Sequence, residues 1–481
     1  MTRSDLFLGQ DQDFKTAPLH NSALKPLFIT SITVDGDNKS SPLSDAVFKS
    51  VLEPVLSQPL QTLEQSVTNF SDIKRKLVFT GLFKDVRVVL DKETEASGLD
   101  KIPEDAIKDY SLESPIPTAA KIVLSPIELN KATATSTTSD SISAFGSRYS
   151  VINALGRAEI LTLQNQLRFV PFKGSVDENS LEAKLVVPLQ KNPSVKAVVD
   201  ANYAKIDLRD VHFVESHDRT LQNQASVNIG VQKAWLSGKF ECIPTFYNGL
   251  SIVARNFKDP FSASTAAADT PYVKNSLVSH FSFDNRQFFG LFPSSGVKFA
   301  LNNEYVLSQK QENESVSTTG HGGSFNKIAL TLQAQRSFFK NMVINSLDFA
   351  CGGIVPLGET ASKVHHIDKF YLGGLSSLKG FCRNEVGSNG GDFFYKLQVA
   401  SSFKLPNTPI DSPLRLQCFL NGGDVFSAKP STFSYAASSG LSLLYKSSVA
   451  NMDLTYALPI TNRPQDVAKP GFSFGVSLSL F

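Results

Sequence analysis

The sequence predicts an all-β transmembrane barrel of about 16 antiparallel strands, preceded by one small α+β domain. Short segments of alternating apolar and polar residues recur after Leu129, where the helical period disappears. The region 130–481 is long enough for about sixteen strands of ~9–11 residues with their connections. The last residues, 471–481, form one more two-faced strand.

The composition excludes a disordered chain and disfavours a nucleic-acid-binding protein. The 481 residues are 41% hydrophobic, which is enough to bury a large core. The formal net charge is only +2, so no strong positive field attracts nucleic acid. The four cysteines lack CxxC spacing, and we expect no metal and no other cofactor.

The first part of the chain has mixed periods, which indicate a flexible tail over 1–25 and an α+β domain over 26–128. The segment LFITSITV alternates like a strand, whereas apolar residues from Leu60 to Leu77 recur at helical spacing and Gly81 is placed to end that helix. Two further strands, VRVVL and KIVL, flank a charged connector.

The remainder, 129–481, is the predicted barrel. Clear alternation is present in the segments 181–187, 297–307, 327–335 and 452–460. Alternation alone also suits a soluble sandwich, but a sandwich of this length would be unusually large. From Gly471 to Ser479 the second face of the last strand contains only glycine and serine, which suits a crowded interior or a seam better than a solvated face.

No window of ~18 apolar residues is present, so no ordinary transmembrane helix is expected. The first twenty residues lack the apolar core of a secretory signal and the arginine-rich, acid-poor pattern of a transit peptide. Any targeting information is therefore expected to be internal.

Five stretches deserve comparison with known families: NALGRAE (153–159), SFDNRQFFGLFPSSGVKF (282–299), KFYLGGLSSLKGF (369–381), FLNGGDVF (419–426) and GFSFGVSLSLF (471–481). In this order along the chain, they resemble the outer-membrane barrel-assembly superfamily. Its members include a bacterial assembly factor, the chloroplast import channel and the core barrel of the mitochondrial sorting and assembly machinery. The domain 26–128 resembles the POTRA module of the same superfamily. In the superfamily, 153–159 resembles the first hairpin turn, 282–299 an Asp-x-Arg…Pro…Gly segment, 369–381 the long-loop element, 419–426 a late inward strand and 471–481 the closing strand.

The chain most resembles the mitochondrial branch, because it has room for one POTRA module and shows no secretory signal. The resemblance implies a non-enzymatic insertase of the mitochondrial outer membrane, with the POTRA module in the intermembrane space. It implies β-barrel precursors as substrates, contact with membrane lipid, and peripheral subunits on the cytosolic side. The resemblance leaves open whether a second barrel is also a partner.

The resemblance also implies that the long loop folds back into the lumen. Its motif residues here are Gly373, Gly374, Leu378, Lys379, Gly380 and Phe381. The family usually has arginine where this chain has Lys379, and the expected partner, Asn421, is uncharged, so a single hydrogen bond is expected in place of an ion pair. Asp284 and Arg286 are candidates for a further lumen pair, with a plain hairpin-stabilising pair as the equal alternative.

A lateral gate is expected where strand 130–138 meets strand 470–481. Both strands are rich in small residues, so side chains should contribute little to their pairing. An incoming precursor strand could then pair with the opened edge. The residues assigned to the gate are Thr133, Thr135, Thr137, Ser473, Gly475, Ser477, Leu478, Leu480 and Phe481, of which Ser473, Gly475, Leu478 and Leu480 match the closing-strand pattern of the family.

Two alternatives remain at this stage. A passive outer-membrane channel would show the same alternation, although it would not need a POTRA-like module to receive chains. A plastid-envelope relative in protein import would share the same motifs, although those relatives tend to carry more than one module. GHGGS (320–324) is similar to an oxyanion loop, but no GxSxG motif accompanies it, which disfavours a hydrolase.

Overall fold

The computed structural model describes residues 23–36, 43–93, 115–140, 142–169, 176–207, 221–235, 242–256, 271–311, 324–357, 364, 366–427, 434–461 and 463–480. Two compact units are present: Met1–Lys131 with Ser150–Leu161 and Leu185–Ala197, and Ala132–Tyr149 with Thr162–Lys184 and Val198–Phe481. The expected division into 1–25, 26–128 and 129–481 stays a prediction, and residues 1–22 of the expected tail lie outside the described ranges.

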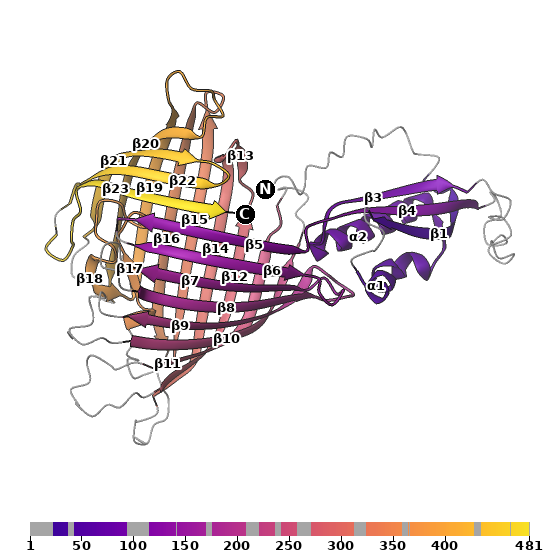
Figure 1. The fold of residues 1–481 in the computed structure, drawn as a ribbon, viewed down its shortest axis with the longest axis horizontal. Coiled ribbons are helices and arrows are strands. Elements are labelled where there is room, and N and C mark those ends of the chain that lie inside the picture. The colour runs from indigo at the N-terminus through magenta and orange to yellow at the C-terminus, as the bar shows by residue number, and fades with distance from the viewer. Residues whose placement is uncertain are drawn as a thin grey trace. The chain divides into compact units, whose positions relative to one another are not determined.

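A four-stranded sheet and two helices form the N-terminal α+β fold (Figure 1). The strand order is β2-β1-β4-β3, with β1 and β4 parallel and the other two pairings antiparallel. The elements are β1 Pro26–Gly36, α1 Asp45–Leu56, β2 Leu60–Thr62, α2 Leu63–Thr80, β3 Phe83–Lys92 and β4 Ile116–Pro126.

Local chemistry explains both ends of α2. Thr62 and Gln65 form a reciprocal capping box, in which each side chain accepts from the other residue's backbone N–H. Gly81 ends the helix in the left-handed conformation, at φ 77°, as expected from the sequence. The expected helical start at Leu60 is wrong, because Leu60 to Thr62 pair with β1 as the short strand β2.

Helix α1 was not expected from the sequence. Its buried residues Val47, Phe48, Val51, Leu52 and Val55 do follow helical spacing, so the signal was present. Pro54 near its end and the proline-containing stretch that follows weaken this signal when the sequence is considered alone. The helix completes a core in which Val51, Ile73, Leu77, Val86 and Ile122 are fully buried.

Replacing Ile73 with alanine is expected to destabilise this α+β fold by about 2–4 kcal/mol, because its side chain is fully buried and a cavity would remain. Val67→Ala on the same helix is the matched control, since Val67 is 49% exposed and its loss should cost less than about 0.5 kcal/mol. Urea unfolding followed by helical circular dichroism measures both. Equal costs would contradict the assigned core.

Sixteen antiparallel strands form a closed barrel, as the sequence predicts (Figure 1). Each strand pairs with the next along the chain, and β23 pairs with β5 to close the ring. The strands are β5 Asn130–Ser139, β6 Ser143–Ile152, β7 Ile160–Phe169, β8 Val176–Pro188, β9 Val195–Asp207, β10 Leu221–Ala234, β11 Thr245–Asn256, β12 Pro271–Asp284, β14 Phe292–Gln311, β15 Ser324–Phe338, β16 Val343–Leu357, β19 Phe393–Lys404, β20 Leu414–Phe426, β21 Ala436–Lys446, β22 Ala450–Pro459 and β23 Gly471–Leu480.

The barrel wall has an apolar outer face and a more polar inner face. On β7 the exposed residues Leu161, Leu163, Leu167 and Phe169 alternate with the less exposed Gln164, Gln166 and Arg168. This is the pattern of a barrel whose outside contacts lipid and whose inside contacts water or protein. No helix among the described residues is both long enough and apolar enough to span a bilayer.

Candidate functional site: the inward loop and the barrel seam

The connection between β16 and β19 contains the long-loop motif. It includes a short 3₁₀ helix (η3, His366–Asp368) and a small two-stranded sheet of β17 Phe370–Leu372 and β18 Val386–Gly391. Gly373, Gly374 and Gly380 have φ angles of 120°, 93° and 86°. These conformations, which favour glycine, make the tight turns of the loop.

The loop lies on the interior side of the wall. Leu378 and Phe381 are buried in one cluster with Val425 of β20 and Ala436 of β21. On these strands the outward positions are recognised by their exposed apolar side chains, such as Leu420 and Leu441, and the loop contacts the alternate positions. That the motif residues brace the barrel wall from within stays a prediction.

The ammonium of Lys379 makes an ion pair, so the expectation that it is held by a hydrogen bond without an ion pair is wrong. Its Nζ lies 3.2 Å from Oδ2 of Asp453 on β22 and donates to Ser442 Oγ at 3.0 Å. It also lies 4.9 Å from the ring centroid of Phe419. Asp453 was missed because it is 74 residues away in sequence and belongs to none of the five motif stretches.

Asn421 does lie at the loop, but it contacts the backbone of Lys379 and not the ammonium. With the amide oriented to satisfy its neighbours, Oδ1 accepts from the Lys379 N–H at 2.9 Å and Nδ2 donates to Ser438 Oγ at 2.6 Å. The Ser438 hydroxyl in turn donates to the Lys379 carbonyl. Asn421 and Ser438 thus fix the backbone, while Asp453 pairs with the charge.

A second anchor holds the beginning of the loop. Asp368 accepts from both terminal nitrogens of Arg255 at 3.0 and 3.2 Å, and from Lys274 Nζ at 2.8 Å. Lys327 Nζ donates to the Asp368 carbonyl at 2.6 Å, and Lys274 also pairs with Glu304 at 2.8 Å. Burial alone would raise the pKa of Asp368, but the Arg255 and Lys274 cations outweigh it and hold the pKa well below its ordinary value. The sequence reasoning missed this cluster entirely.

Asp284 and Arg286 are brought together, with Nε of Arg286 2.9 Å from Oδ1 of Asp284. Arg286 also donates to Gln333 Oε1 on β15 at 3.1 Å, so the pair is not confined to its own turn. Gly296 lies against the backbone of this turn and has a φ of 105°. A Cβ added at Gly296 would lie 2.6 Å from the Asn285 carbonyl oxygen. Whether this pair acts in the lumen remains a proposal.

The seam between β5 and β23 is short. Among the described residues it has six residue pairs, from Gly475↔Ser139 to Leu480↔Ala134, against eight between β22 and β23 and fifteen between β15 and β16. Thr137 faces Ser477, with the two Oγ atoms 3.5 Å apart. The seam thus has fewer ladder pairs than either of these two pairings, and each of its pairs includes a residue no larger than threonine.

The structure places only some of the expected gate residues at the seam. Thr135, Thr137, Gly475, Ser477, Leu478 and Leu480 are in its register. Thr133 and Ser473 have no described partner across the seam, Ser473 being paired with Thr455 of β22. Phe481 lies outside the described residues.

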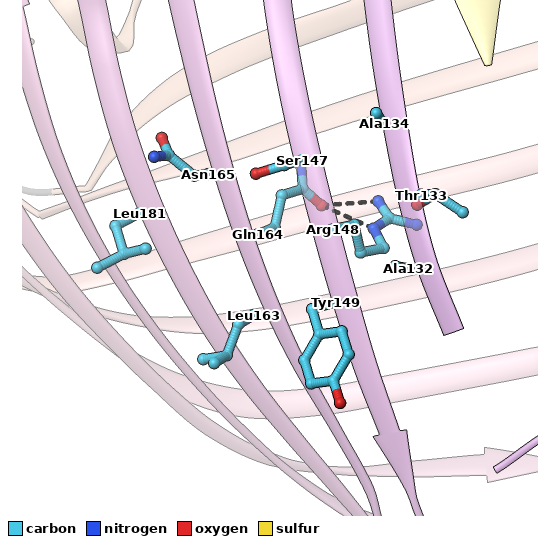
Figure 2. Close-up of a pocket in the computed structure, with 10 residues that line it drawn as sticks. All are labelled: Ala132, Thr133, Ala134, Ser147, Arg148, Tyr149, Leu163, Gln164, Asn165 and Leu181. Carbon is cyan, nitrogen blue, oxygen red and sulfur yellow. Dashed lines mark hydrogen bonds between the residues drawn. The ribbon is translucent and has the colours of Figure 1, made fainter. Parts of the chain in front are cut away.

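A hollow of about 320 Å³ lies beside the seam on strands β5 to β8 (Figure 2). Small residues of β5, Ala132 and Ala134, line it together with Tyr149 and Leu163, and Arg148 donates twice to Gln164 Oε1. Within the described part of the chain, no group of three or more His, Cys, Asp or Glu side chains could hold a metal ion.

A family model for the Omp85 superfamily domain matches residues 153–480, which is more than half of the chain. The chain belongs to the Omp85 superfamily. The members of this superfamily are non-enzymatic insertion and assembly factors. The Omp85 match includes all five motif stretches except the final residue of the last one.

Omp85 relatives with curated names point to one branch. A SAM50-like protein of Schizosaccharomyces pombe is 30% identical over 31% of this chain and 33% of its own length. The sorting assembly machinery 50 kDa subunit of Saccharomyces cerevisiae is 30% identical over 24% of this chain, and the match spans 27% of that protein. The sorting and assembly machinery component 50 homolog B of Xenopus laevis is 23% identical over 85% of this chain and 82% of its own.

Solved structures agree with the fold. BamA from Haemophilus ducreyi, lacking POTRA domains 1–3, has a TM-score of 0.67 with 12% identity, over 94% of this chain and 85% of that one. At this identity the likeness concerns the fold alone, which is a barrel of the Omp85 type.

Proposed function

We propose that this protein folds and inserts β-barrel precursors into the mitochondrial outer membrane, by pairing precursor strands at the seam between β5 and β23. The single observation that carries the proposal is that six-residue seam in a chain of the Omp85 superfamily. The likeness to SAM50-named relatives supports the assembly role, the mitochondrial location and an assignment of the α+β domain to the intermembrane space.

The physical need for such a factor follows from the membrane. An unpaired strand edge in hydrocarbon leaves backbone N–H and C=O groups unsatisfied, each at a cost of several kcal/mol. An opened seam offers β5 as a template, on which a precursor strand satisfies its ladder before it leaves the protein. Peripheral subunits on the cytosolic side and a second barrel belong to this proposal as partners.

Locking the seam is expected to stop precursor assembly. Thr137→Cys with Ser477→Cys joins a directly opposed pair across the seam, in a chain whose four native cysteines are replaced. Under oxidising conditions, insertion of a radiolabelled porin precursor into mitochondria carrying this variant should fall at least tenfold, and reduction should restore it.

The matched control is Thr245→Cys with Ser282→Cys, a directly opposed pair within the wall whose Oγ atoms lie 2.7 Å apart. This disulfide fixes β11 to β12 and should leave insertion unchanged. Undiminished insertion with the locked seam would contradict the proposed function. A passive channel would then explain the barrel better.

A further inference from the structure

The segment that leads into the closing strand, residues 463–469, runs along the inward loop. Lys469 N–H donates to the Gly380 carbonyl at 2.9 Å, and Cys382 N–H donates to the Val467 carbonyl at 2.9 Å. Val467 N–H donates to the Glu385 carbonyl at 3.0 Å, and Phe381 and Ala468 form a β-bridge. The segment is therefore hydrogen-bonded, backbone to backbone, to residues 380–385 of the loop.

Ionic contacts fix the beginning of this segment. Arg463 lies 2.8 Å from Asp424 of β20 and 2.7 Å from Asp466, and Asp466 accepts from the Gly387 N–H of the loop at 2.9 Å. Burial would lower the pKa of Arg463, but its hydrogen bonds to Asp466 and Asp424 raise it above its ordinary value. Segment and loop are thus tied together at the wall.

The other end of the segment reaches across the seam. Lys469 makes an ion pair with Asp140, which directly follows β5, and the Asp140 N–H donates to the Phe474 carbonyl of β23 at 3.3 Å. Lys469 itself lies two residues before β23. The Lys469–Asp140 ion pair therefore connects the residues that flank β23 and β5, the two strands that must separate for the seam to open.

We propose that the segment 463–469 is a latch, in which the Lys469–Asp140 pair keeps the seam closed and the backbone pairing with the loop makes loop and seam open together. This inference rests on the proposed function only for the purpose of the opening, which is the pairing of precursor strands at the seam. The pair is partly shielded, with side-chain exposures of 36% and 17%, so it contributes more than a fully exposed pair would. Because the seam has only six described residue pairs, one additional ion pair is a substantial part of the interactions that hold it closed.

The test is amide hydrogen–deuterium exchange of the full chain in lipid nanodiscs. In Lys469→Gln and in Asp140→Asn, exchange of the β23 peptide should become about three to five times faster, and exchange of the loop peptide 369–391 should rise with it. The exchanged pair Asp140→Lys with Lys469→Asp should return both peptides to within about twofold of the parent.

The matched control is Arg168→Gln, which removes a similar partly shielded pair, Arg168–Glu178 at 2.6 Å, between β7 and β8. It should leave β23 exchange unchanged. Unaltered β23 exchange in both single variants, or no recovery in the exchanged pair, would overturn the latch. Faster β23 exchange with an unchanged loop would overturn the coupling.

Precursor insertion, measured in parallel, separates this inference from the proposed function. If β23 and loop exchange rise as expected while insertion is unaffected, the latch holds the seam but the seam does not serve precursors. If insertion changes while exchange stays at the parental rate, the latch is wrong and the insertion effect has another origin.

Discussion

Replacing Asp368 with leucine is expected to lower the free energy of unfolding of the barrel by about 3–5 kcal/mol. The substitution leaves Arg255, which is 6% exposed, without its carboxylate partner, and leaves Lys274, which is 3% exposed, with Glu304 alone. Removing one partner of a buried ion cluster costs more than the cluster contributes, because the remaining charges cannot be hydrated. Urea unfolding in detergent, followed by the fluorescence of the single tryptophan, Trp235, measures the loss.

Glu178→Gln provides the comparison, since its pair with Arg168 is 22–30% exposed and its removal should cost less than about 1 kcal/mol. The pKa of Asp368 is held below its ordinary value, so its stabilising effect is present above pH ~4 and is lost only as the pH falls further. The parent protein should accordingly keep this contribution between pH 7 and pH 5. A cost below 1 kcal/mol for Asp368→Leu would show that the loop is not anchored by this residue.

Gly380→Val is expected to displace the loop tip and to reduce precursor insertion about tenfold or more. Gly380 has a φ of 86°, and a Cβ there would lie 2.9 Å from the Cβ of Ser438 and 3.4 Å from that of Ala457. Strain and collision therefore act together at one position, and the β-branched side chain worsens both. Insertion of a porin precursor into mitochondria and protease accessibility of the loop are the two measurements.

Gly81→Val separates strain from collision, because Gly81 has a similar φ of 77° but a Cβ added there would meet nothing within 4 Å. It should destabilise its own domain by about 1–2 kcal/mol and leave loop accessibility unchanged. Lys379→Glu places a second carboxylate beside Asp453 and should also reduce insertion. Parental insertion with Gly380→Val would reduce the motif to an ordinary surface turn.

The sequence was sufficient for the barrel because alternation is a local property. Each strand shows its two faces within ten residues, and the number of such segments sets the size of the ring. The capped helix α2 was predictable for the same reason, since Gly81 and the apolar spacing lie within one window. Helix α1 was missed where Pro54 interrupts the local pattern.

The contacts of the candidate site were only partly predictable. The motif located the loop and placed Asn421 near it, but Asp453, Asp368 and Asp140 find their partners 74, 113 and 329 residues away. A single charged residue within an alternating strand carries no sequence spacing that identifies its partner on another strand or loop. The carboxylate that pairs with Lys379 lies on β22, at Asp453, and only the register of β20, β21 and β22 shows that this strand passes close to the loop.

The seam has a consequence for how this chain itself folds. Thr137 and Ser477 are 340 residues apart, so the logarithmic entropy term for joining them is about 5 kcal/mol, against about 2 kcal/mol for a hairpin of ~15 residues. Hairpins between successive strands should therefore form early and the ring should close last, after synthesis of the whole chain. Until then one edge of β5 is unpaired in the newly made chain. We therefore expect its own insertion into the membrane to need the same assembly activity that we propose for the mature protein.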